Sequence, residues 1–172
     1  MAHGWTSFYS LIGSAAAGLI GLIFIVITLS NGRGRPSSLR AFALYMTPTI
    51  FHFGAALAVS AFIEIPGDSP PETAAGLGLV ALAGLACCLR SAMGILRSPD
   101  GAPHWSDFWL YAGAPAVLYA GLIVAAIGVW TTADWSPRLT ALTLLVLLLL
   151  AVRNAWDTIT WIAASGGGSS DP

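Results

Sequence analysis

Charge is scarce in this sequence. Only 9% of its 172 residues are charged and lysine is absent, whereas 56% of the residues are hydrophobic. A soluble domain carries about 25% charged residues, so this chain has too little polar surface to dissolve as a globule. The formal net charge is −1, and no basic stripe interrupts the apolar pattern, which argues against a nucleic-acid partner. We therefore expect an integral membrane protein whose main partner is the lipid bilayer.

Potential metal ligands are also few. Cys87 and Cys88 are adjacent in an apolar stretch, and neighbouring residues of a helix point about 100° apart, so the two thiols cannot face one metal. They resemble free cysteines that pack as small apolar residues. His3 and His104 lie outside the apolar stretches, which leaves His52 without a second histidine for haem ligation. We expect neither a metal nor another cofactor.

Catalytic motifs are missing from the chain. There is no Gly-x-Ser-x-Gly elbow, no His-Glu-x-x-His pair and no phosphate-cradling loop. A non-catalytic function is therefore favoured. A membrane-embedded enzyme that acts on a lipid headgroup through Asp107 and Asp157 is the least favoured alternative.

Long apolar runs set the fold class. A helix needs about 20 apolar residues to cross a bilayer, and the breaks between the runs are rich in Gly, Pro, Ser and Asp, which end helices. The connections are too short to fold a soluble domain. We predict one all-α transmembrane domain over residues 1–164, followed by a flexible tail, 165–172. Its five spans are expected at about 6–30, 41–64, 74–97, 106–131 and 138–163.

Arginine placement predicts the orientation. The first connection contains Arg33, Arg35 and Arg40, and the third contains Arg97, whereas the second has no basic residue. Cytoplasmic connections carry an excess of basic residues. We therefore expect a multi-pass protein with its N-terminus outside and its C-terminus inside, in a cytoplasmic membrane of the bacterial type.

Four charges fall inside the predicted spans and not at their terminal residues. A charged group in the bilayer centre costs about 2.5 kcal/mol or more. Arg153 and Asp157 are four residues apart, and hence on one face of the last span, which should point into the bundle or a wet cavity. The predicted orientation puts Arg90 and Asp107 on the same inner-leaflet side. We expect these four residues to form one balanced cluster.

Uncharged polar residues extend this cluster. Asn154 and Thr158 form a second row beside the ion pair, and Tyr111 and Pro115 follow Asp107 at intervals of four. Pro115 should free a backbone carbonyl and kink the helix. The network either fastens the helices together, at about 0.6 kcal/mol per contact, or forms an inner gate whose arginines attract an anion.

The second span holds the other candidate site. Thr47, Pro48, Thr49 and His52 lie in its inner to middle part. The histidine could relay a proton, ligate a metal or hydrogen-bond a tyrosine, a threonine or a carbonyl, and the hydrogen bond is favoured. At the outer end of this span, Glu64 begins an acidic rim that either concentrates cations at a mouth or is simply solvated.

Small residues on several spans predict close helix packing and assembly. They let backbones approach where lipid provides no hydrophobic force between helices. Some of these faces should serve the bundle itself. The relevant residues are Ser14, Ala17, Gly18 and Gly21; Gly76, Gly78, Gly84 and Cys88; and Gly121, Ala125 and Gly128.

Together these features favour a small oligomeric channel or passive ion-transport protein. Five spans cannot enclose a wide pore, so conduction would need a homo-oligomer with a central axis. The alternative is an accessory subunit that assembles with partner membrane subunits. The transport and gating residues of the channel hypothesis are Thr47, Thr49 and His52 at mid-depth, and Arg90, Asp107, Tyr111, Arg153, Asn154 and Asp157 at the inner gate.

Overall fold

The computed structural model describes residues 4–30, 39–67, 69–97 and 105–165, and this part of the chain is helical apart from short turns. Five stretches in it are long and apolar enough to cross a membrane, which is consistent with a multi-pass membrane protein. The fold-class prediction is confirmed to that extent, whereas the orientation stays a prediction. The expected tail falls mainly on residues 166–172, outside the described part. The elements are α1 (Thr6–Ser30), α2 (Leu39–Glu64), α3 (Pro70–Leu96), α4 (Trp105–Phe108), the π-helical turn η1 (Trp109–Gly113), α5 (Ala114–Trp130) and α6 (Ser136–Ser165).

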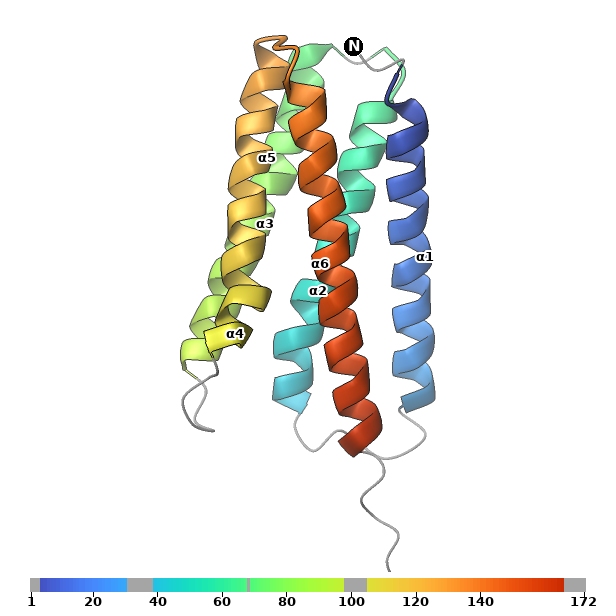
Figure 1. Ribbon diagram of the computed structural model, residues 1–172, viewed down its shortest axis with the longest axis vertical. Helices are drawn as coiled ribbons and strands as arrows, with labels where there is room; N and C mark the ends of the chain where they lie inside the picture. Colours follow the sequence, from blue (N-terminus) through green and yellow to red (C-terminus); the bar gives the residue numbers. More distant parts are fainter. Residues whose placement is uncertain (1–3, 31–38, 68, 98–104, 166–172) are drawn as a thin grey trace, which may run out of the picture.

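The long helices run alternately up and down along one axis (Figure 1). Helix α1 packs against α2 and α6, α3 packs against α2 and α5, and α5 also packs against α6. A further contact between α2 and α6 makes these two the most enclosed helices. We call the end where α1 begins the N-terminal end of the bundle, and the opposite end the α4 end.

Local sequence explains where the helices stop and start. Ser69 precedes α3 and donates from both its backbone N–H and its hydroxyl to Glu72 Oε2, at 2.7 Å each. Pro70 follows at the first helical position, where the missing N–H is not needed. Between α5 and α6, Thr132 adopts a φ of 55°, a conformation suited to a tight turn. The predicted breaks therefore have identifiable structural causes.

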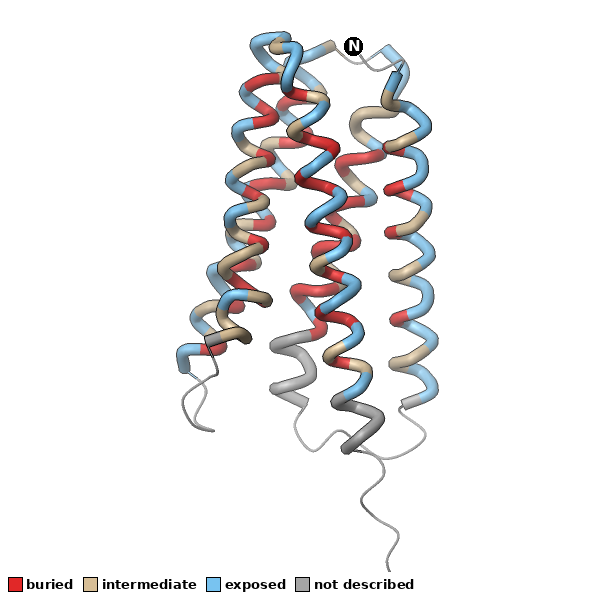
Figure 2. The backbone as a smooth tube through the Cα atoms, viewed as in Figure 1, coloured by how far each residue is buried: buried red, intermediate tan, exposed pale blue. Residues whose placement is uncertain are grey.

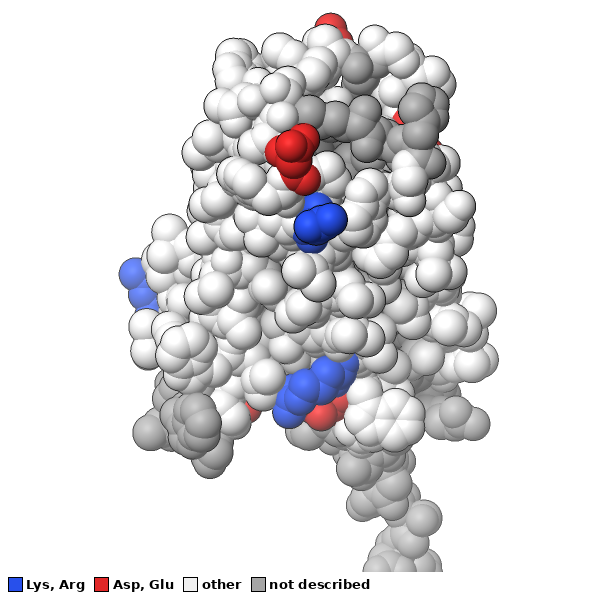
Figure 3. Space-filling model, turned by 45° about the horizontal axis from the view of Figure 1, so that its top comes forward, with Lys and Arg blue, Asp and Glu red and all other residues white. Residues whose placement is uncertain are grey.

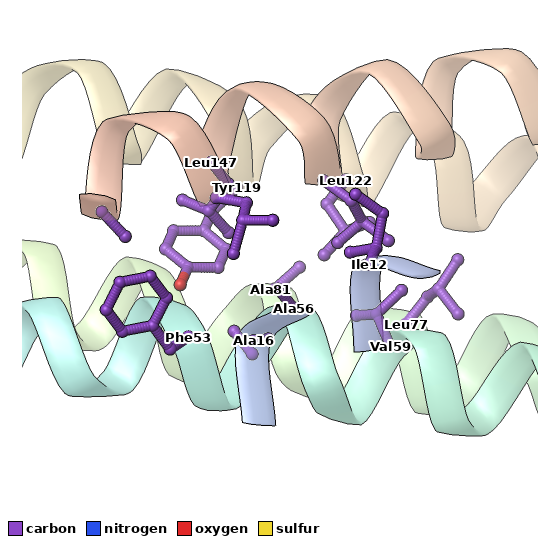
Figure 4. Close-up of a cluster of buried hydrophobic side chains, with 14 of the residues drawn as sticks. Ile12, Ala16, Phe53, Ala56, Val59, Leu77, Ala81, Tyr119, Leu122 and Leu147 are labelled. Atoms are coloured by element: carbon purple, nitrogen blue, oxygen red, sulfur yellow. The ribbon is translucent and has the colours of Figure 1, made fainter. Parts of the chain in front are cut away.

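Buried residues recur along each of the long helices (Figure 2). Figure 4 shows a central part of this core, where residues from all five long helices meet around Tyr119 and Leu122. Many large apolar side chains point outward instead, and Trp156 is 69% exposed. An apolar outer surface suits contact with lipid chains, so helix association depends on close packing and internal polar contacts.

Glycine permits the closest of these approaches. A Cβ on Gly84 in α3 would overlap the ring of Tyr119 in α5, and one on Gly76 would lie 2.9 Å from the ring of Phe62 in α2. By contrast, Gly18 and Gly21 on α1 are exposed, and an added Cβ there meets no atom within 4 Å. Gly76 and Gly84 of α3 therefore serve the bundle, whereas the small face of α1 lies on its surface.

Replacing Gly84 by alanine tests this packing, because the Tyr119 ring is fully buried and cannot move aside. We expect Gly84→Ala to lower the free energy of unfolding by about 1–3 kcal/mol, the usual cost of overpacking. Denaturation of the detergent-solubilised protein measures the change. Gly78→Ala is the matched control on the same helix, because its added Cβ meets no atom within 4 Å. Equal effects of the two substitutions would contradict the packing argument.

Candidate functional site: polar contacts between the helices

The π-helical turn η1 leaves one backbone carbonyl without its usual donor. The N–H of Ala114 donates to the carbonyl of Trp109, five residues earlier. In the same register the carbonyl of Leu110 would accept from residue 115, which is a proline and has no N–H. Asn154 Nδ2 of α6 donates to the Leu110 carbonyl instead, at 2.8 Å. The carbonyl expected to be freed by Pro115 is thus bound by another helix.

Asn154 connects several groups at the α4 end of the bundle. Its side chain is fully buried. Its backbone carbonyl accepts hydrogen bonds from the Tyr111 hydroxyl at 3.3 Å and from Thr158 Oγ1 at 2.9 Å. The predicted second row of α6, Asn154 and Thr158, is therefore the row that faces the core.

The neighbouring ion pair lies farther out. Arg153 and Asp157 are joined at 2.8 Å, as their spacing predicts, but their side chains are 48% and 43% exposed. This face does not point into the bundle; the other alternative, a wet cavity, stays a prediction. The row of Arg153 and Asp157 lies beside the row of Asn154 and Thr158 on α6. The uncharged row is the buried one, because burying charged groups costs more than burying an amide and a hydroxyl.

Three of the four expected charges gather near one tyrosine. Asp107, Arg153 and Asp157 all lie within electrostatic range of the Tyr111 hydroxyl. Arg90 does not join them: it lies exposed in a groove between α2 and α3. Among the described residues, Arg90 and Asp107 make no ion pair. The predicted four-charge cluster is thus only partly assembled, and Figure 3 shows the charged groups as isolated patches on an otherwise uncharged face.

The histidine of α2 is sealed in the core. His52 Nδ1 lies 2.9 Å from the Tyr119 hydroxyl, and both side chains are fully buried. This contact is the kind of hydrogen bond that the sequence favours for His52. Within the described part of the chain, His52 Nε2 has no hydrogen-bond partner. Thr49 is buried on the same helix, whereas Thr47 is exposed and lines the groove that contains Arg90.

Sequence reasoning missed the tyrosines that complete these contacts. Tyr119 binds His52, and the Tyr9 hydroxyl of α1 donates to the carbonyl of Pro137 in α6 at 3.0 Å. A signal was available, because a tyrosine hydroxyl in an apolar helix needs a polar partner. The identity of that partner depends on how the helices are arranged, which spacing along one helix does not reveal.

Three of the polar contacts each join a different pair of elements in the bundle. The Tyr9 contact joins α1 to α6, the His52 contact joins α2 to α5, and the Asn154 contact joins α6 to η1. The arrangement matches the interpretation in which polar groups fasten the bundle. Comparisons with protein families, with curated proteins and with solved structures find no match to this chain.

The link between Asn154 and Pro115 is measurable as a coupling energy. Asn154→Leu removes the donor for the Leu110 carbonyl and should lower the free energy of unfolding by about 1–2 kcal/mol, because a buried acceptor is left unsatisfied. Pro115→Ala restores a backbone N–H in the helix. We therefore expect Asn154→Leu to cost less in the Pro115→Ala background. Additive effects in this double-mutant cycle would contradict the link.

Proposed function

We propose that this chain is a non-catalytic subunit of a membrane assembly, inserted with its N-terminus outside, and that its outer surface binds further transmembrane helices. Those helices belong to other copies of the chain or to a partner subunit. One observation carries the proposal: Arg90 and the Arg153–Asp157 pair lie on the outer surface of the bundle, within helices that are otherwise apolar.

The position of Arg90 is the strongest part of this argument. It lies six residues before the end of α3, which is about 9 Å along a helix. Its neighbours Leu89 and Met93 are exposed apolar residues. A charged group at the bilayer centre is unfavourable by about 2.5 kcal/mol or more, and an arginine nearer a helix end costs less because its long side chain extends toward the interface; a polar or acidic group on an adjacent helix lowers the remaining cost.

The outer face of α1 supports the same proposal. Ser14, Ala17, Gly18 and Gly21 are all exposed. A second helix can come close to such a face, because no bulky side chain holds its backbone away. The described contacts of α1 within the chain are with α2 and α6 on its other side. The small face and the surface charges therefore both provide contacts suited to neighbouring helices.

A channel between copies is the second candidate. A pathway inside one chain receives no support, because His52 and Thr49 are fully buried in the packed core. The half-exposed pair Arg153–Asp157 on α6 favours a path between subunits instead. Charged side chains around such an axis would select ions.

Site-specific photo-crosslinking tests the assembly. A benzophenone side chain at Leu89, which is 61% exposed beside Arg90, should give a discrete crosslinked product in membranes. Arg90→Gln in the same protein should reduce its yield severalfold. Val117 on α5, which is 66% exposed, is the control position and should give no such product. No product at Leu89, or a yield independent of Arg90, would contradict the proposal.

Ion flux separates the two candidates. For an assembly subunit, liposomes that contain the purified protein should be no more permeable to small anions and cations than empty liposomes. Flux that is lost in Arg153→Gln, in protein that still crosslinks through Leu89, would instead establish the channel. Arg138→Gln, a change at an exposed arginine of the N-terminal end, is the matched control.

A further inference from the structure

A cavity of about 530 Å³ opens at the N-terminal end of the bundle. Its walls come from the start of α1, the end of α2, the starts of α3 and α6, and the end of α5. The volume is in the range of pockets that bind small organic molecules. The cavity lies far from Asn154 and its contacts at the α4 end, and it plays no part in the assembly proposed above.

Glu64 gives this cavity its charge. It is the only charged residue among the described residues that line the cavity. Its Oε1 atom is buried and has no hydrogen-bond partner in the described part of the chain. A carboxylate oxygen that is removed from water and has no partner is unfavourable. Glu64 itself lines the cavity, so a cationic group bound there would lie beside its carboxylate and balance its charge.

The remaining walls favour an organic cation over a metal ion. Trp5 and Tyr9 contribute aromatic rings, and Ile63 and Val129 contribute apolar surface. Aromatic faces attract ammonium groups, most strongly where water is excluded. Calcium, in contrast, takes six to eight oxygen ligands. One carboxylate beside aromatic and apolar walls matches an alkylammonium ion far better.

The hydroxyl groups of the lining reinforce this preference. Tyr9 donates to the carbonyl of Pro137, Ser136 to that of Ala133, and Thr140 Oγ1 to that of Ser136. Because these protons are already engaged, the oxygens are left as acceptors. A ligand that donates hydrogen bonds, or that carries positive charge without needing donors, therefore suits the cavity.

We propose that this cavity is a binding site for an organic ammonium ion, with Glu64 as its counter-ion and the ring of Trp5 against its apolar groups. The predicted orientation places the site on the outer side of the membrane. The Glu64 carboxylate thus recognises the charge, and the size of the cavity admits a substituent beyond the ammonium group.

Calorimetric titration of the detergent-purified protein tests the site with choline, tetramethylammonium and n-butylammonium. At least one of these ions should bind saturably. The uncharged analogue of choline, in which carbon replaces nitrogen, should bind about tenfold more weakly or worse. This comparison uses the unaltered protein and does not depend on any variant folding.

Two substitutions then identify the counter-ion. Glu64→Gln should reduce the affinity for the ammonium ion by about tenfold or more, and it should leave the affinity for the uncharged analogue unchanged. Glu72→Gln is the matched control, because Glu72 caps α3 outside the lining and glutamine also serves in such a cap. Trp5→Leu should weaken ammonium binding without a change of charge.

The outcomes that would overturn the proposal are distinct from failure of the assembly. They are the absence of binding by all three ammonium ions, equal affinity for the uncharged analogue, or ammonium binding unaffected by Glu64→Gln. Crosslinking through Leu89 does not depend on any of these results. Equal affinity for charged and uncharged ligands would indicate an apolar pocket only.

Discussion

The need to pair polar groups in an apolar environment governs this bundle. Lipid offers no hydrogen bonds, so each polar group within an apolar helix requires a partner from the protein. The chain meets this requirement with few residues: Tyr9 binds a carbonyl of α6, His52 binds Tyr119, and Asn154 binds the carbonyl of Leu110. Each contact joins different helices, so the pairing requirement also specifies which helices are neighbours.

The same requirement divides the polar residues between interior and surface. The amide of Asn154, the imidazole of His52 and the hydroxyl-bearing residues Thr49 and Thr158 are buried, whereas the Arg153–Asp157 pair remains half-exposed. An uncharged group costs less to bury even where one of its atoms stays unpaired, as His52 Nε2 does among the described residues, whereas an ion pair keeps a large desolvation cost even when its members touch. The charged groups consequently remain at the surface, and the uncharged polar groups of the core hold the fold.

The sequence was sufficient to predict the spans but not how they face one another. The apolar runs and the breaks at residues such as Ser69 and Pro70 locate the helix ends to within a few residues. Spacing by four also predicts that Arg153 contacts Asp157. Depth along the membrane places Arg90 near that pair, yet depth contains no information about which side of the bundle a residue occupies. Arg90 therefore lies in a groove between α2 and α3.

Within the candidate site, the sequence likewise does not reveal which residues contact one another. The partner of His52 lies 67 residues away in the chain, and no local pattern connects the two. The rows that contain Arg153 and Asn154 differ by about 100° of helical rotation, and both are periodic, so periodicity cannot decide which row is buried. The proline was a usable signal, because a freed carbonyl must find a donor. The donor itself, Asn154, could be identified only from the packing of α6 against η1.

The π-helical turn also sets the rotational phase of the helix that follows it. In a continuous α-helix, Tyr111 and Tyr119 would point about 80° apart, since they are eight residues apart. The wide turn takes up one extra residue, which brings the two directions to within roughly 20° of each other. Both tyrosines consequently face the core and are buried. The extra residue of the π-helical turn thus lets Tyr111 contact Asn154 while Tyr119 contacts His52. A regular α-helix would turn the two tyrosines toward different sides.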